Sequence, residues 1–362
     1  MKNTVGTVYD VKHGNISVIW ILLFLLLAHP KYICIMKKLA LAIICVLCIV
    51  SCTEKKKDTS EKINGSLAQS VGKINELSVV INNESWTGSL GDTIRKYFGA
   101  EVPGLPQEEP LFSMRQLPAE AFTGIARRRR MFLKIEKGEE AKVYVAKNKY
   151  ATPQLGYVIT GTSEAEIIGL IKERSAGMIL KYKKVETREK QYRIKKSVEY
   201  IPQLQEKMGI TLKIPSAYRI AKEEDKFFWL RKDITNGDMN LMIYELPLGS
   251  ISKDSSTIAK IIKVRDSVGQ LKIPTNSGKF ITEEAYAPYL YETKLDNKFT
   301  FETKGTWEIK DRYMAGPFVN YVIDDLPNNR QLVIEGFVLA PSVRKRNFMF
   351  ELEAIIKTIK FD

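Results

Sequence analysis

"GPFVNYVIDDLPNNRQLVIEGFVLAP", residues 316–341, is the stretch that decides the fold. Two apolar runs flank Asn328-Asn329, and asparagine tolerates the left-handed backbone that short hairpin turns need. The stretch therefore predicts two antiparallel strands joined by a tight turn. Gly336 interrupts the second run, which is typical of a bulge or of a place where another segment approaches the strand closely.

The rest of the second half extends this hairpin into a sheet with helices. Further strands are predicted in four stretches with alternating or continuous apolar residues, namely 210–233, 239–247, 280–295 and 298–310. A short helix is expected over residues 256–268. Another helix is expected after Ser342, with an apolar face formed by Phe348, Leu352, Ile355 and Ile359.

The first half begins with "ELSVVIN", residues 76–82, whose continuous apolar run predicts a strand buried on both faces. A helix follows, with an apolar face formed by Trp86, Leu90, Ile94 and Phe98. Residues 102–118 contain four prolines and are expected to form an irregular loop. A hairpin is then predicted around residues 138–140, between "RRRRMFLKIEKG" and "AKVYVAKN".

A second helix is predicted to open at Ser163, which forms a capping box with Glu166. Its apolar spacing continues, after a break, to about Met208, with a kink expected at Pro202 and an end at Gly209. Together these elements predict an α+β fold with largely antiparallel sheets, packed helices and a C-terminal helix. We expect two α+β halves, residues 73–208 and 209–362.

"MKKLALAIICVLCIVSC", residues 36–52, predicts where the protein resides. Lys37 and Lys38 precede an apolar run of 12 residues, which is too short for a bilayer span of about 20 residues and suits a signal peptide. The last four residues, Ile49 to Cys52, resemble a lipobox, the cleavage signal of bacterial lipoproteins. The resemblance implies that signal peptidase II cuts before Cys52 and that Cys52 is acylated. A plain signal peptide or a membrane anchor is the alternative.

The signal peptide divides the N-terminal region into three segments. Residues 1–35 are expected to be an upstream extension from a wrongly assigned start, residues 36–51 the signal peptide, and residues 52–72 a polar, flexible tether. Thr53, rather than aspartate, follows the cysteine, which resembles outer-membrane sorting. We therefore expect a lipid-anchored envelope protein at the outer membrane that faces the periplasm, with surface exposure as the alternative.

Processing at Cys52 would remove most of the reactive side chains. Cys34, Cys45 and Cys48 lie in the removed segment together with both histidines. A mature chain with neither histidine nor free thiol excludes Ser-His-Asp and Cys-His catalysis, and it excludes zinc sites built on these residues. Carboxylate and Ser/Lys chemistry stay open. We expect no cofactor and no metal, and an enzyme is the less favoured class.

The mature chain would carry 51 basic and 41 acidic residues, a net formal charge of +10. Two basic clusters are candidates for anion binding: Arg127, Arg128, Arg129 and Arg130, and Arg344, Lys345 and Arg346. The alternative for the first cluster is an exposed strand entry whose charges deter edge pairing. The second cluster opens the last helix, where the helix dipole disfavours cations. It therefore predicts a carboxylate partner from elsewhere in the chain or an anionic ligand.

Two acidic pairs have competing interpretations. Glu108-Glu109 in the proline-rich loop could act as acid and base or bind a cation, and the alternative is solvated charge or an ion pair. Asp324-Asp325 at the hairpin predicts turn chemistry rather than a calcium loop, because no Asp-x-Asp-x-Asp spacing follows.

Four stretches resemble one protein family in the same order: "INELSVVINNESWTGSLGDTIRKYF", "PGLPQEEPLF", "GTWEIKDRYMAGPF" and "EGFVLAPSVRKRNFMFELEAI". The family is a set of envelope lipoproteins, largely from the Bacteroidota, catalogued as a domain of unknown function. The similarity covers residues 74–359, implies an envelope lipoprotein and supplies no catalytic residues. The order of elements in the second half also resembles the PsbP and Mog1 fold, an antiparallel sheet with a terminal helix.

These observations predict a membrane-anchored envelope lipoprotein that acts as a non-enzymatic binding or assembly module. Its expected partners are the bilayer, through acylated Cys52, and other envelope proteins or anionic envelope polymers, but not nucleic acid. One alternative is a hydrolase of envelope glycans or peptides that uses carboxylates or Ser/Lys. Another is a carrier of lipids or small ligands, which predicts an apolar cavity of several hundred Å³.

Overall fold

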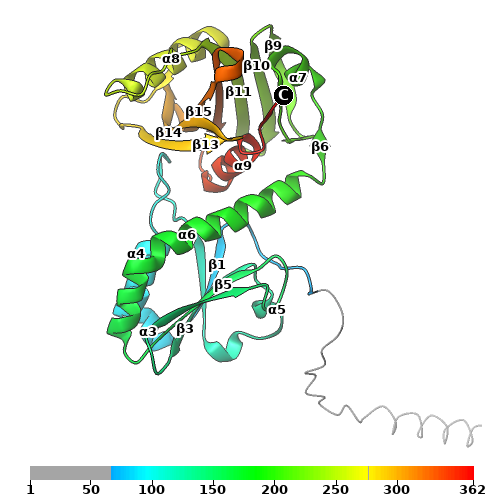
Figure 1. The fold of residues 1–362 in the computed structure, drawn as a ribbon. Coiled ribbons are helices and arrows are strands. Elements are labelled where there is room, and N and C mark those ends of the chain that lie inside the picture. The colour runs from blue at the N-terminus through cyan, green and yellow to red at the C-terminus, as the bar shows by residue number, and fades with distance from the viewer. Residues whose placement is uncertain (1–66, 276) are drawn as a thin grey trace, which may run out of the picture. The chain divides into compact units, whose positions relative to one another are not determined.

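The computed structural model describes residues 67–275 and 277–362, drawn in colour in Figure 1. The upstream extension, the signal peptide, Cys52 and the predicted tether up to residue 66 lie outside the described residues. The described residues fold as α+β with a C-terminal helix, which confirms the predicted fold class. Neither described range contains a helix that is long and apolar enough to cross a bilayer.

The first half is built on one five-stranded sheet with helices around it. The strands are β1 (Glu76–Val80), β2 (Ser113–Leu117), β3 (Met131–Lys137), β4 (Lys142–Lys147) and β5 (Leu155–Gly161). The helices are α3 (Asn83–Thr87), α4 (Ser89–Phe98), α5 (Gly124–Arg127) and α6 (Glu164–Ile194), with a short 3-10 turn, η1 (Ala119–Ala121). The strand order is β2-β1-β3-β5-β4, and only the β4–β5 pair is antiparallel.

The hairpin predicted around residues 138–140 is wrong, because β5 lies between β3 and β4. β5 buries Leu155, Tyr157 and Ile159, so it takes an inner position with a partner on each side. β4 is mostly exposed and begins and ends with lysine, which suits the edge of a sheet. The apolar side chains of β5 therefore determine that β3 pairs with β5. The short loop between β3 and β4 does not make these two strands pair with each other.

The predicted helices form, with two changes at their ends. α4 buries Leu90, Ile94 and Phe98 as predicted, but the extended backbone of Gly88 separates it from the short α3. α6 begins after Ser163, whose hydroxyl accepts a hydrogen bond from the backbone N–H of Glu166 at 3.3 Å. The predicted capping residue is therefore in place.

The break expected before Met208 is present: α6 ends at Ile194, and residues up to Met208 form a separate helix, α7 (Pro202–Met208). Pro202 opens α7 and does not kink α6, because a proline in the first turn of a helix removes an N–H that has no partner there. Gly209 ends α7 in the left-handed conformation, with φ of 58°, as the sequence predicts.

The second half is an eight-stranded antiparallel sheet that curls into a half-barrel (Figure 1). Its strands are β9 (Arg219–Glu224), β10 (Phe227–Ile234), β11 (Gly237–Pro247), β12 (Phe280–Thr282), β13 (Tyr289–Leu295), β14 (Lys298–Ile309), β15 (Met314–Asp325) and β16 (Arg330–Leu339). The order is β12-β14-β15-β16-β11-β10-β9, and β13 also pairs with β14. Two short ladders pair β6 (Val198–Glu199) with β8 (Ile214–Pro215) and β7 (Ile210–Thr211) with β17 (Lys360–Phe361).

Two helices pack on this sheet and form separate cores with it. α8 (Thr257–Lys272) contributes Ile261 to a core with Phe280 and Phe318, while α9 (Arg346–Ile356) contributes Leu352 to the other. A Cβ atom added to Gly336 of β16 would lie 3.0 Å from the Cβ of Leu352. This confirms the predicted close approach, since only glycine lets α9 pack so near the strand. The hairpin turn between β15 and β16 is also confirmed, through η2 (Leu326–Asn328) and a left-handed Asn329.

Candidate functional site

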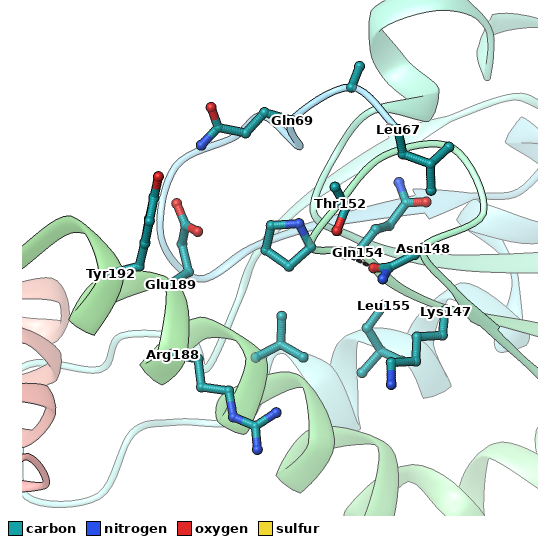
Figure 2. Close-up of a pocket in the computed structure, with 13 residues that line it drawn as sticks. Leu67, Gln69, Lys147, Asn148, Thr152, Gln154, Leu155, Arg188, Glu189 and Tyr192 are labelled. Carbon is teal, nitrogen blue, oxygen red and sulfur yellow. Dashed lines mark hydrogen bonds between the residues drawn. The ribbon is translucent and has the colours of Figure 1, made fainter. Parts of the chain in front are cut away.

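A pocket of about 730 Å³ lies in the first half, where the described chain begins (Figure 2). Three segments line it: residues 67–69, the loop that joins β4 to β5 with its flanking strand ends (147–155), and α6 between residues 185 and 192. We call it the α6 pocket. Most of its surface is apolar. Its size falls in the range of sites that enclose a small ligand.

Backbone hydrogen bonds hold the first described residues against the β4–β5 loop. The N–H of Thr152 donates to the carbonyl of Ala68 at 2.9 Å, and the N–H of Ser70 donates to the carbonyl of Thr152 at 3.0 Å. The N–H of Val71 donates to the carbonyl of Arg128 at 2.9 Å. The last residues of the predicted tether are therefore paired with the fold, and they form one wall of the pocket.

The adjacent wall, formed by the β4–β5 loop, is organised by Gln154, which is 2% exposed. Its Nε2 donates to the carbonyls of Arg127 and Arg129, at 2.7 Å each, and its Oε1 accepts from the N–H of Tyr150 at 2.9 Å. One buried amide thus fixes the loop to the arginine run. The wall of the pocket is built before any ligand arrives.

The helical wall contains the acidic residue Glu189, whose charge is compensated. Its Oε1 accepts from Nε of Arg193 at 2.7 Å and lies 3.5 Å from Nη1 of Arg130. Glu189 is 6% exposed, and it is the only acidic side chain among the described residues that line the pocket. Two guanidinium groups thus contact this carboxylate, so the acidic residue of the pocket is already paired within the fold.

Two cationic side chains at the pocket are without such compensation. Lys147 and Arg188 are exposed, and neither forms an ion pair with a carboxylate of the described residues. In the view of Figure 2 both head groups lie along the lower side of the cluster, and Leu155 is drawn beside Lys147. The pocket therefore combines an apolar surface with two available positive charges. Such a surface complements a molecule with a hydrocarbon part and a negative group.

The predicted cluster Arg127–Arg130 lies directly behind this pocket. Nε of Arg127 donates to the carbonyl of Phe122 at 2.8 Å, Nη2 of Arg128 donates to the carbonyl of Gln69 at 3.1 Å, and Arg129 pairs with Glu76 at 2.8 Å. Arg130 is 2% exposed and pairs with Glu186 at 2.5 Å. Only Arg130 is buried, whereas Arg127 is exposed and Arg128 and Arg129 are half-buried, and anion binding by these residues stays a prediction.

The predicted cluster Arg344–Arg346 lies at the start of α9, where a carboxylate from the first half meets it. Glu109 accepts the backbone N–H groups of Lys345 and, at 3.2 Å, Arg346. Glu109 is 4% exposed, so it is a buried helix cap and not a solvated loop charge. Nη1 of Arg346 also donates to the carbonyl of Pro110 at 2.6 Å. A carboxylate partner was one of the two alternatives, and binding of an anionic ligand here stays a prediction.

A serine-lysine pair occurs at the start of α8. Nζ of Lys260 lies 2.5 Å from the hydroxyl of Ser252, and it also pairs with Asp254 at 2.9 Å. Hydrogen bonds from Ser252, Ser256 and Lys260 hold the pKa of Asp254 well below its usual range. Asp254 therefore engages Lys260 together with the serine, and the pair lies outside the lining of the α6 pocket. Within residues 67–275 and 277–362, no group of three metal-ligating side chains occurs.

Asp325 at the predicted turn is buried and neutralised by two cations. Its carboxylate lies 2.9 Å from Nζ of Lys298 and 2.8 Å from Nε of Arg330, and Nδ2 of Asn328 donates to it at 2.7 Å. Burial alone would raise the pKa of Asp325, but these partners hold it below its usual value. The residue is therefore part of the hairpin turn.

Comparison with protein families finds two matches that follow each other along the chain. Residues 70–195 match "Domain of unknown function (DUF8532)", and residues 197–358 match "Domain of unknown function (DUF4837)". The two matches meet just after the end of α6. A comparison with curated proteins found no match.

Comparison with solved structures finds weak similarities. The Ran-binding protein Mog1p of Saccharomyces cerevisiae is 10% identical over 42% of this chain and 90% of that chain, with a TM-score of 0.28. LpqN of Mycobacterium tuberculosis, described as involved in cell envelope biogenesis, is 12% identical over 42% and 83%, with a TM-score of 0.26. Human StAR-related lipid transfer protein 5 is 8% identical over 48% and 93%, with a TM-score of 0.23. At these TM-scores no functional conclusion follows.

Proposed function

We propose that this chain is an envelope lipoprotein, acylated at Cys52, whose folded part binds an anionic amphiphile in the α6 pocket. The ligand class is a fatty acid or a single-chain anionic lipid. One observation carries the proposal: the pocket of about 730 Å³ has a mainly apolar surface with Lys147 and Arg188 as uncompensated cations. The proposed role is binding, without a catalysed reaction.

The energetics of the pocket suit such a ligand. Each buried CH₂ group of an acyl chain contributes about 0.8 kcal/mol, so the apolar surface supplies most of the affinity. An exposed ion pair adds only about 0.2–1 kcal/mol, so Lys147 and Arg188 select the negative head group more than they strengthen binding. The structure of the pocket thus supports selectivity for an acidic lipid over a neutral one.

The position of the pocket in the sequence supports a membrane source for the ligand. Leu67 lines the pocket and follows Cys52 by 15 residues. Even a fully extended chain of that length spans at most about 50 Å. If Cys52 carries the acyl chains, the pocket stays close to the bilayer that holds them. We propose the periplasmic face of the outer membrane as this location.

The alternative of an envelope hydrolase has less support. The α6 pocket offers Glu189 as its acidic side chain, and two guanidinium groups hold that carboxylate. A glycosidase mechanism needs two carboxylates about 5–10 Å apart, one on each side of the bond to be cleaved. The described lining of the pocket does not provide this pair.

Photo-crosslinking of a fatty acid tests the proposal directly. The acylated full chain is placed in phosphatidylcholine nanodiscs, diazirine-palmitate is added, and the labelled peptides are identified by mass spectrometry after irradiation. We expect label in residues 147–155 and 185–192. Ala68→Trp fills part of the pocket from an exposed position and is expected to reduce labelling by about tenfold, as loss of one to two kcal/mol of apolar burial would.

Two matched variants control this experiment. Ala176→Trp adds the same bulk on an exposed part of α6 away from the pocket, and it is expected to leave labelling unchanged. Arg188→Gln combined with Lys147→Gln is expected to weaken binding by about 2- to 30-fold, whereas Lys172→Gln on the same helix has no effect. Labelling spread evenly over the chain, or equal in both tryptophan variants, would exclude the α6 pocket as the site.

A further inference from the structure

A second pocket, of about 520 Å³, lies between the proline-rich loop of the first half and the β14 strand of the second half. Residues 101–106 and Glu108 line it from the loop, and Tyr286, Tyr289 and Thr306 are among the residues that line it from the second half. We call it the acidic pocket. It shares no lining residue with the α6 pocket.

The loop that forms one wall is held in place at its base and at its tip. At the base, the N–H of Val102 donates to the carbonyl of Glu109 at 2.9 Å, and Glu109 itself caps α9. At the tip, Gly104 has φ of 78°, and a Cβ added there would lie 2.9 Å from the backbone nitrogen of Gly305. Only glycine fits this approach to β14, so the wall is a fixed part of the fold.

The charge of this pocket is opposite to that of the chain. Glu101 and Glu108 both line it and are exposed, and neither forms an ion pair with a cation of the described residues. No lysine or arginine is among its described lining residues. In a chain with a formal net charge of +14, two uncompensated carboxylates at one pocket attract cations locally.

Aromatic and hydroxyl groups add to this preference. Tyr286 is 64% exposed and Tyr289 is 50% exposed, so their rings are available to a ligand. A tyrosine ring attracts an ammonium group that sits over its face, which is the cation–π interaction. Thr306 lines the pocket and is 4% exposed, and its hydroxyl has no hydrogen-bond partner among the described residues. A buried polar group without a partner is unusual and marks a position that a ligand or water can satisfy.

We propose that the acidic pocket binds an organic amine through its primary ammonium group. Glu101 and Glu108 supply the negative charge, the rings of Tyr286 and Tyr289 supply the cation–π surface, and the Thr306 hydroxyl accepts or donates one hydrogen bond. The ammonium comes from a free polyamine or from an ethanolamine head group. The pocket volume of about 520 Å³ accommodates either molecule.

Equilibrium dialysis of the acylated full chain in phosphatidylcholine nanodiscs tests this, with radiolabelled spermidine and phosphoethanolamine as the two probes. Saturable binding of spermidine assigns the site to a free polyamine, and saturable binding of phosphoethanolamine assigns it to the head group. Glu101→Gln combined with Glu108→Gln is expected to weaken binding of the active probe by about 2- to 30-fold, because two exposed charge contacts are lost. Tyr289→Ser is expected to weaken it by about threefold, because one exposed cation–π contact is lost.

A charge-matched variant makes the test specific. Glu120→Gln combined with Glu139→Gln removes two exposed carboxylates that lie outside the acidic pocket, and it is expected to leave probe binding unchanged. If probe binding weakens equally in the two double variants, the effect comes from the overall charge of the protein and not from the acidic pocket. That result would overturn the proposal. Failure of both probes to bind below about 1 mM would overturn it as well.

Discussion

Arg130 and Arg346 each belong to a run of basic residues, yet the two runs meet their carboxylates differently. Arg130 is buried, and its guanidinium pairs with Glu186 of α6, which is also fully buried. At α9 the carboxylate of Glu109 binds backbone N–H groups, including that of Arg346. The first contact joins two buried charges, and the second joins one charge to a helix end. The two basic runs look alike in the sequence. Removing the carboxylate partner is nevertheless expected to lower the free energy of unfolding by different amounts in the two places.

The largest effect is expected from Glu186→Gln. This change leaves the buried guanidinium of Arg130 with Glu189, at 3.5 Å, as its remaining carboxylate, beside a hydrogen bond to the carbonyl of Lys73 at 2.9 Å. We expect the free energy of unfolding to fall by about 3 kcal/mol, since a buried cation without its partner is costly. Urea unfolding followed by circular dichroism measures the change.

Two variants show whether the charge itself causes this loss. Glu173→Gln, on the same helix but in an exposed pair with Arg174, is expected to leave stability unchanged. Arg130→Met combined with Glu186→Leu replaces both charges by apolar groups and is expected to recover most of the loss. A double variant as unstable as Glu186→Gln would show that the loss does not come from the unpaired charge but from shape or from the hydrogen bond that Glu186 accepts from the backbone N–H of Asn75 at 2.6 Å.

An intermediate effect is expected from Glu109→Gln. The amide keeps one acceptor for the N–H groups of Lys345 and Arg346 but removes the negative charge from the start of α9. We expect a loss of about 1–2 kcal/mol in the free energy of unfolding. Glu108→Gln changes the neighbouring exposed residue and is expected to have no effect on stability. A loss as large as that of Glu186→Gln would remove the distinction between the two basic runs.

The smallest effect concerns pH, through Glu351 of α9. Burial would raise the pKa of Glu351, but Lys190 of α6 and Lys232 of β10 outweigh this and hold it below its usual value. The folded-state pKa lies below the unfolded value, so the stabilisation is present above about pH 4.5 and is lost as pH falls through the folded-state pKa. The lysines are partly exposed, which keeps the effect small.

Urea titrations at about pH 7 and about pH 3 measure this contribution. We expect the wild-type chain to lose more stability on acidification than Glu351→Gln, which has no carboxyl group to titrate. An equal loss in both chains would mean that Glu351 does not link α9 to α6 through its charge.

Local patterns predicted the second half of the fold better than the first. The turn at Asn329 and the glycine under α9 are properties of one or two residues, and the structure confirms both. The pairing of β3 with β5 depends on a strand about 20 residues further along the chain. The alternation of apolar and polar residues within β3 and β4 does not indicate that β5 lies between them. The short loop between them therefore led to the wrong hairpin.

The candidate pocket could not be predicted for a similar reason. Its walls come from segments separated by about 80 and 30 residues in the chain, and Lys147 and Arg188 each look like an ordinary solvated charge. The one available clue was the spacing of Val185, Arg188 and Tyr192, which places them on one side of α6. Glu186 and Glu189 were missed because the sequence does not show which helical carboxylates become buried.

Native mass spectrometry of the protein released from its own membranes tests the central claim most directly. We predict a chain that begins at Cys52, carries covalent acyl groups and retains one non-covalent fatty acid or anionic lipid, which Ala68→Trp fails to retain. A chain that still includes residues 1–51 without acyl groups would contradict the proposed anchor. An acylated chain that retains no lipid, or retains it equally in the variant, would contradict the proposed binding site.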